Sequence, residues 1–147
     1  MLNRLFSRFR KNHSPDDDIK WLTDAADALA DAIYGTLKLQ FEVADCRPSD
    51  IPQQKELFVA CYVAGFCDVM AQATQARAGG NLSMTLTARI LQNIFGKTHG
   101  MHMWHKVDEA MRASTPICLA AMTIGAEDAN LGLQRKPAFS LAKYLSE

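Results

Sequence analysis

The stretch that decides the fold is LFVACYVAGFC, residues 57–67. It carries no charged side chain, and its apolar residues fall on all sides of a helix. A helix that is apolar all round is expected only where other elements cover it on several sides. Its small residues would let neighbouring backbones approach closely: Ala60, Ala64, Gly65 and, one turn further on, Ala71. The stretch therefore predicts a central, buried helix.

A second uncharged stretch, STPICLAAMTIGA, covers residues 114–126. Thr115 followed by Pro116 is a typical helix start, because proline is well suited to the first helical position. Both uncharged stretches are shorter than the ~20 residues that a membrane-spanning helix requires. The opening residues also lack the apolar core of a secretory signal. We therefore interpret both stretches as core helices of a bundle.

Start and stop signals divide the remaining chain into further helices. A first helix begins at Ser14 and Pro15, and the segment 45–52, with two prolines, separates it from the central helix. We expect the central helix to run to about Arg77. Two helices should follow, one from Asn81 to about Phe95 and one from Gly100 to just before Ser114. The last two should be a helix that starts at Pro116 and a short helix within 138–145. No run has the alternating pattern of a strand. The prediction is an all-α, compact bundle of five or six helices with two nearly all-apolar central helices, forming a single domain over 14–147.

The first helix should have one apolar and one acidic side. Its apolar residues recur at spacings of three and four: Ile19, Leu22, Ala26, Leu29, Ile33 and Leu37. Three aspartates fall together on the opposite side, and we name them the acidic stripe: Asp24, Asp27 and Asp31. They lack the loop geometry of a calcium site. The acidic stripe is therefore a solvated face, or a surface for a basic partner.

The segment 1–13 that precedes this helix is basic and amphipathic. Its apolar side chains share one helical face: Leu2, Leu5, Phe6 and Phe9. Between and after them stand Arg4, Arg8, Arg10 and Lys11, with no acid in residues 1–11. Three roles fit: contact with an anionic membrane, docking on a protein partner, or folding back on the acidic stripe. So short a segment binds lipid only marginally, which weakens the membrane alternative.

Charge and cysteine usage limit the classes of function. The formal net charge is zero and the sequence pI is about 6.9, so we expect no nucleic-acid partner. The charge is nevertheless uneven, because no acid occurs between Asp68 and Asp108, and this asymmetry favours self-association. The four cysteines form no C-x-x-C pair, which argues against a redox motif or a zinc ribbon and favours reduced thiols in the cytoplasm. Two apolar helices in so small a bundle also favour a homodimer.

Residues 97–105, KTHGMHMWH, contain three of the four histidines. On a helix, an apolar stripe would form from Met101, Trp104, Val107 and Met111. On the other side His102, His105 and Glu109 would lie together, and two imidazoles and a carboxylate could approach one divalent metal. His99 stands before Gly100, is expected ahead of the helix, and could not join the same ion. The set is incomplete, so a solvated helix face is the simpler interpretation, and no resident cofactor is expected.

The sequence contains two further candidate sites. Arg77, Arg89 and Lys97, with the glycine pair at 79–80, could hold an anion at a helix start, although the spacing matches no phosphate-binding motif. Cys118 should fall in the first turn of its helix, a position suited to a reactive thiol, yet its apolar neighbours favour burial.

No catalytic constellation is complete, so we expect a protein that is not an enzyme. The leading hypothesis is a helical protein-interaction or regulatory module, homodimeric and cytoplasmic. The first alternative is a metal-binding or metal-dependent helical protein using His102, His105 and Glu109. The second is a small-molecule binder with a pocket between the central helix, the helix from Asn81 and the helix from Pro116.

Overall fold

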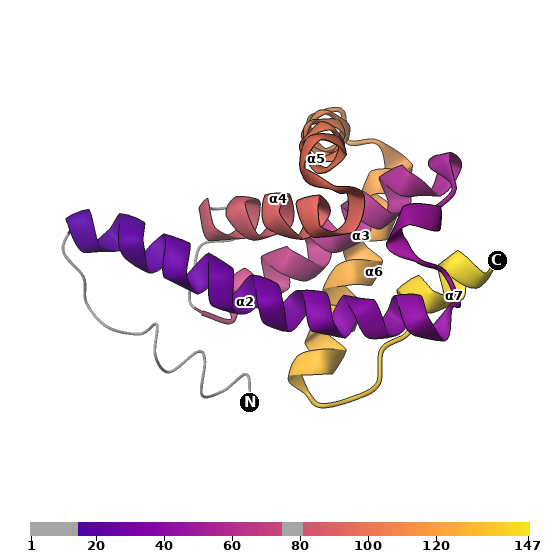
Figure 1. Ribbon diagram of the computed structural model, residues 1–147, viewed down its shortest axis with the longest axis horizontal. Helices are drawn as coiled ribbons and strands as arrows, with labels where there is room; N and C mark the ends of the chain where they lie inside the picture. Colours follow the sequence, from indigo (N-terminus) through magenta and orange to yellow (C-terminus); the bar gives the residue numbers. More distant parts are fainter. Residues whose placement is uncertain (1–14, 75–80) are drawn as a thin grey trace.

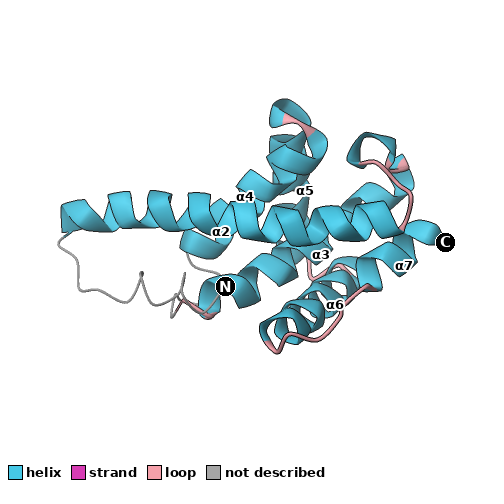
Figure 2. Ribbon diagram, turned by 60° about the horizontal axis from the view of Figure 1, so that its bottom comes forward, coloured by secondary structure: helices cyan, strands magenta, loops and turns pink. Residues whose placement is uncertain are grey.

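The computed structural model describes residues 15–74 and 81–147, which contain six α-helices and no strand (Figures 1 and 2). In chain order the elements are α2 (Pro15–Val43), the short 3-10 helix η1 (Pro48–Asp50), α3 (Gln53–Gln72), α4 (Asn81–Phe95), α5 (Lys97–Arg112), α6 (Pro116–Leu133) and α7 (Ser140–Ser146). The predicted all-α bundle is confirmed. Within the described ranges, no helix combines the length and apolarity needed to cross a bilayer. The segment 1–13 and the glycine pair at 79–80 lie outside the described residues.

The central helix α3 is buried along most of its length. Figure 1 shows it passing behind α2, and it contacts α4, α5, α6 and α7. An unbroken run from Phe58 to Cys67 is buried, as the sequence predicts. The second apolar helix, α6, differs, because only one side of it is covered and Ile117 and Leu119 remain 45% and 47% exposed. One apolar helix is thus the core, and the other presents an outer surface on which Ile117 and Leu119 are exposed and Glu127 is the exposed charged residue.

Two glycines let α3 and α6 touch through their backbones. A Cβ on Gly65 of α3 would lie 2.0 Å from the carbonyl oxygen of Met122, and a Cβ on Gly125 of α6 would lie 2.0 Å from that of Tyr62. Such overlaps are far below van der Waals contact, so only glycine fits at either position. The close approach predicted for Gly65 is confirmed; its partner Gly125 was not singled out by the sequence.

The first helix, α2, follows its predicted faces over the described side chains. Ala26, Leu29, Ile33 and Leu37 are buried, and all three aspartates of the acidic stripe are exposed. The side chains of Ile19 and Leu22 lie outside the described residues. This buried face packs on α4, and the C-terminal end of α2 contacts α7 (Figure 2).

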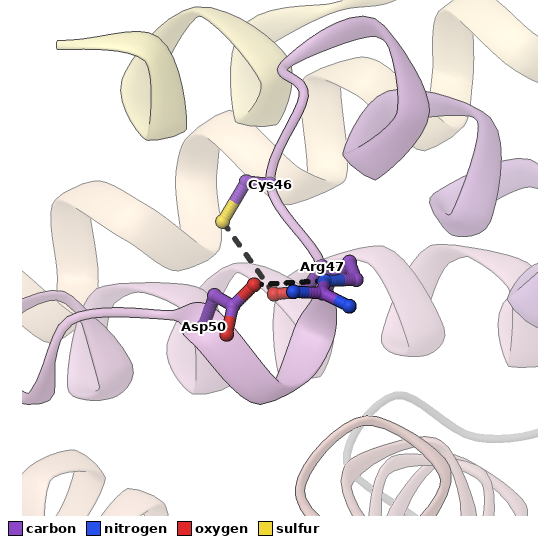
Figure 3. A network of polar contacts seen from close by, with 3 residues as sticks. All are labelled: Cys46, Arg47 and Asp50. Carbon is purple, nitrogen blue, oxygen red and sulfur yellow. Dashed lines mark hydrogen bonds and ion pairs between the residues drawn. The ribbon is translucent and has the colours of Figure 1, made fainter.

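The turn between α2 and α3 is held by local polar contacts (Figure 3). The Arg47 Nε donates to the Asp50 carboxylate at 2.9 Å, and the Cys46 thiol donates to the Arg47 carbonyl at 3.6 Å. Pro52 then stands at the N-cap of α3, because its fixed φ suits a helix entry. The predicted interruption at 45–52 is confirmed.

Two predicted boundaries were wrong. α3 ends at Gln72 rather than near Arg77, and the Thr74 hydroxyl donates to the Ala71 carbonyl at 2.6 Å where the helix closes. α5 begins at Lys97 rather than Gly100, because Gly96 adopts a φ of 88° that turns the chain directly from α4 into α5. His99 therefore lies in the first turn of α5 and not ahead of the helix.

A buried polar network joins four helices. The Gln40 amide donates to the Tyr62 hydroxyl at 2.9 Å, and that hydroxyl donates to the Asp128 carboxylate at 2.6 Å. The backbone NH and hydroxyl of Ser140, at the start of α7, donate to the same carboxylate at 3.2 and 2.7 Å. The Ala142 NH donates to the Gln40 carbonyl oxygen at 3.1 Å. Every buried side chain in this network has a partner, which is the condition for burying polar groups without a large penalty.

Our first prediction tests the contact between α3 and α6. Gly65→Ala should destabilise the protein by about 3 kcal/mol or more, because the added methyl group meets backbone that cannot move independently. Gly35→Ala is the matched control, since a Cβ at this position of α2 would have nothing within 4 Å. It should stabilise the fold by about 0.5–1 kcal/mol through helix propensity. If Gly65→Ala and Gly35→Ala changed the free energy of unfolding in urea by the same amount, this result would contradict the close contact.

Our second prediction concerns alkaline pH. Burial raises the pKa of the Cys67 thiol from 9.0 to about 12, and burial with the hydrogen bond to Asp128 raises the pKa of Tyr62 above 10.0. The unfolded chain therefore loses these protons at lower pH than the native state does. The free energy of unfolding should be highest below pH 9 and fall between pH 9 and 12, by up to about 1.4 kcal/mol per pH unit for each group. In urea titrations, Cys67→Ala should show a shallower fall; an unchanged slope would contradict the assignment.

Candidate functional site

A groove of about 230 Å³ opens where α3, α4, α5 and α6 meet. It is lined by side chains from all four helices: Ala64 and Asp68 of α3, Ser83, Met84 and Thr87 of α4, Trp104, Asp108 and Met111 of α5, and Met122 of α6. We call it the methionine groove. The contact of Gly65 with Met122 sets the distance between α3 and α6 beside Ala64. Ala64 and Met122 both line the groove.

The walls of the methionine groove are mainly apolar and adaptable. Three methionines and a tryptophan line it, and Met84 is 45% exposed. Methionine side chains are flexible and polarisable, so they can repack around different apolar groups. On α6, exposed Leu119 stands one turn before Met122 and extends this apolar surface. The groove therefore offers an anchor point for an apolar side chain.

Two carboxylates stand among the lining residues of the methionine groove. The Asp68 carboxylate accepts from the Gln72 amide at 3.0 Å, and Asp108 pairs with Arg112 at 3.2 Å. Asp68 and Asp108 both line the groove, whereas none of its lining residues is basic. The Thr87 hydroxyl donates to the backbone carbonyl of Ser83 within α4 at 2.8 Å. An apolar group that carries or adjoins a positive charge is the chemistry that such a surface attracts.

Sequence reasoning missed the two carboxylates as parts of one site. The sequence does distinguish them, because Asp68 and Asp108 are the last acid before and the first acid after the acid-free region. The fold brings these two residues to the same groove. The apolar stripe predicted for α5 was partly wrong: Val107 is buried, but Trp104 and Met111 are half-exposed and line the groove. The buried positions of α5 are instead Gly100, Met103, Val107 and Ala110.

The histidines lie on the exposed side of α5. His102, His105 and Glu109 are all exposed, as their helical spacing predicts. His99 pairs with Glu56 of α3, and its ring stacks on that of His102 with centroids 5.8 Å apart. Among the side chains that the structure describes, no three histidine, cysteine or acidic groups are placed to hold one metal ion. The metal site stays a prediction.

Of the proposed anion-binding residues, the structure describes Arg89 and Lys97. Arg89 forms an ion pair with Asp27 of the acidic stripe, across a polar cavity of about 290 Å³ between α2 and α4. Asp31 lines the same cavity, so its acids outnumber its one base. Lys97 is exposed at the start of α5, and Arg77 lies outside the described residues. The structure thus uses Arg89 to neutralise part of the acidic stripe.

Of the remaining candidate residues, Cys118 lies in the core, and those of segment 1–13 lie outside the described residues. Cys118 follows Pro116 in the first turn of α6 as predicted, and it is fully buried, with its sulfur 2.8 Å from that of Cys61. Thr115 is the N-cap, but its side chain makes no capping hydrogen bond. The apolar residues Leu2, Leu5, Phe6 and Phe9 lie outside the described residues.

Comparison with protein-family models, with curated proteins and with solved structures found no match to this chain. Among the residues that the structure describes, the methionine groove is the strongest candidate site, because it gathers apolar, aromatic and charged side chains from four helices around an accessible opening.

Our third prediction concerns the histidines. Zinc should bind weakly in titration calorimetry, and His102→Ala and His105→Ala should each reduce the binding by a similar, partial amount. Exposed imidazoles without buried partners to orient them are poorly held for specific coordination. Binding with defined stoichiometry that His105→Ala abolishes would contradict this prediction and support a metal site.

Proposed function

We propose that the protein is a non-enzymatic helical interaction module that binds a basic amphipathic segment in the methionine groove. The observation that carries the proposal is the combination of Met84, Met111, Met122 and Trp104 with the carboxylates of Asp68 and Asp108. Helix-binding grooves are typically apolar and adaptable, and charges at the rim select the partner.

The size of the groove favours a protein segment over a larger free ligand. Pockets for drug-sized molecules typically measure about 300–1,000 Å³, whereas this groove measures about 230 Å³. One or two apolar side chains fit such a volume, and their backbone would remain outside. A small organic cation is the alternative occupant, and it corresponds to the small-molecule hypothesis drawn from the sequence.

The chain itself contains a segment with the required chemistry. Residues 1–11 combine four bases and no acid with the apolar residues Leu2, Leu5, Phe6 and Phe9. We propose that this segment of a second copy occupies the groove, which makes the module a homodimer. The exposed Leu119 beside the groove supports this, because a partner that covers Met122 would also cover it. A cytoplasmic setting is part of the proposal on the grounds of cysteine usage.

Our fourth prediction tests this function. In sedimentation velocity, the full chain should dimerise at tens of micromolar, and excess synthetic peptide of residues 1–11 should convert the dimer to monomer. Asp68→Asn with Asp108→Asn should weaken dimerisation by roughly 5- to 30-fold, since the variant removes two exposed charge pairs and each contributes about 0.5–1 kcal/mol. Added salt should weaken it as well.

The matched control is Asp24→Asn with Asp31→Asn, which removes two exposed acids outside the groove. If this variant dissociates and the groove variant does not, the acidic stripe is the docking surface instead. A full chain that stays monomeric and binds no peptide would contradict the proposal. Binding of a small organic cation in place of the peptide would favour the small-molecule alternative.

A further inference from the structure

Two cysteines from distant parts of the chain meet in the core. Cys61 of α3 and Cys118 of α6 are both 0% exposed, and their sulfur atoms are 2.8 Å apart. A disulfide bond measures about 2.05 Å, so the sulfurs need to approach by less than about 1 Å to bond. The sequence shows four cysteines without a C-x-x-C pair, and no local pattern indicates this pairing across 57 residues.

The packing around the pair restricts its movement. Gly65 and Met122 meet one helical turn further along both helices, with the same separation in sequence as Cys61 and Cys118. The backbone contact at Gly65 therefore keeps the two sulfurs opposite each other. The other cysteines have different neighbours: Cys46 contacts the Arg47 carbonyl, and Cys67 lies beside Thr87.

We propose that Cys61 and Cys118 form a redox pair that closes to an intramolecular disulfide when the protein meets a peroxide. One cysteine thiolate attacks a peroxide oxygen, the O–O bond breaks, and a sulfenic acid and water form after proton transfer. The sulfur of the second cysteine then attacks the sulfenic sulfur, the S–O bond breaks, and a second water leaves. Two thiols are oxidised and one hydrogen peroxide is reduced to two waters.

Burial determines how this pair would respond. Desolvation and the contact with Cys118 raise the pKa of the Cys61 thiol, so little thiolate is present in the closed core. Oxidation should therefore be slow in the native state and faster when α3 and α6 separate transiently. Once formed, the disulfide would join the two helices that build the core and restrict the unfolded chain. This inference is independent of the methionine groove.

The test is peptide mapping of the full chain after treatment with hydrogen peroxide. Remaining thiols are alkylated under denaturing conditions and the protein is digested with trypsin. We expect a linked pair of peptides, 56–77 and 113–135, with Cys46 alkylated. Because peptide 56–77 contains both Cys61 and Cys67, the Cys67→Ser variant identifies the linked residue, and it should form the same linkage.

Thermal unfolding supplies an independent measurement. The oxidised parent and Cys67→Ser should melt roughly 5–15 °C above their reduced forms, and dithiothreitol should reverse the rise. Cys61→Ser should show no rise. Three results would each overturn the proposal. Cys61 and Cys118 could remain free after full oxidation of Cys46, Cys118 could be linked to Cys67, or the disulfides could form between molecules. If Cys61→Ser fails to fold, the melting temperatures of the oxidised and reduced parent and Cys67→Ser still test the proposal.

Discussion

The backbone contact between α3 and α6 is the constraint on which the rest of the structure depends. Gly65 and Gly125 each face a backbone carbonyl of the other helix, so the two helices pack more closely than side chains would permit. Three features lie next to this contact: Met122 reaches the methionine groove, Cys118 meets Cys61, and Asp128 comes within hydrogen-bonding distance of Tyr62. A change in the distance between these helices would alter all three at once.

The polar network around Asp128 extends this constraint to α2 and α7. A buried carboxylate is costly unless its oxygens accept hydrogen bonds, and here Tyr62 and Ser140 supply them. Gln40 then connects the same hydroxyl to the backbone of α7. The stacking of Phe58 on Tyr144, with ring centroids 3.8 Å apart, adds an apolar contact. The short helix α7 is thus held by specific partners rather than by its own length.

Much of the fold could be predicted because local periodicity determines which face of a helix is buried. The stripe of Ala26, Leu29, Ile33 and Leu37 and the exposed aspartates of α2 followed from spacing alone. The start of α5 did not, because the turn at Gly96 depends on a positive φ that glycine permits without requiring.

The candidate site was less predictable than the fold. Asp68 and Asp108 are far apart in the sequence, and their meeting depends on how α3, α4 and α5 cross. Periodicity assigned Trp104 and Met111 to the core because it cannot distinguish a buried face from a groove that is open to solvent. The pairing of Tyr62 with Asp128 likewise arises from the contact between α3 and α6, and no local pattern indicates it.

Native-state hydrogen exchange tests most directly whether the contact of α3 with α6 organises the fold. We expect amides near Gly65 and Gly125 to exchange only through global unfolding, with the same free energy and the same denaturant dependence. Amides of α2 and α4 should exchange at lower free energy, through partial opening that leaves α3 and α6 packed together. Exchange of α6 through local opening while α2 and α4 remain protected would contradict the account.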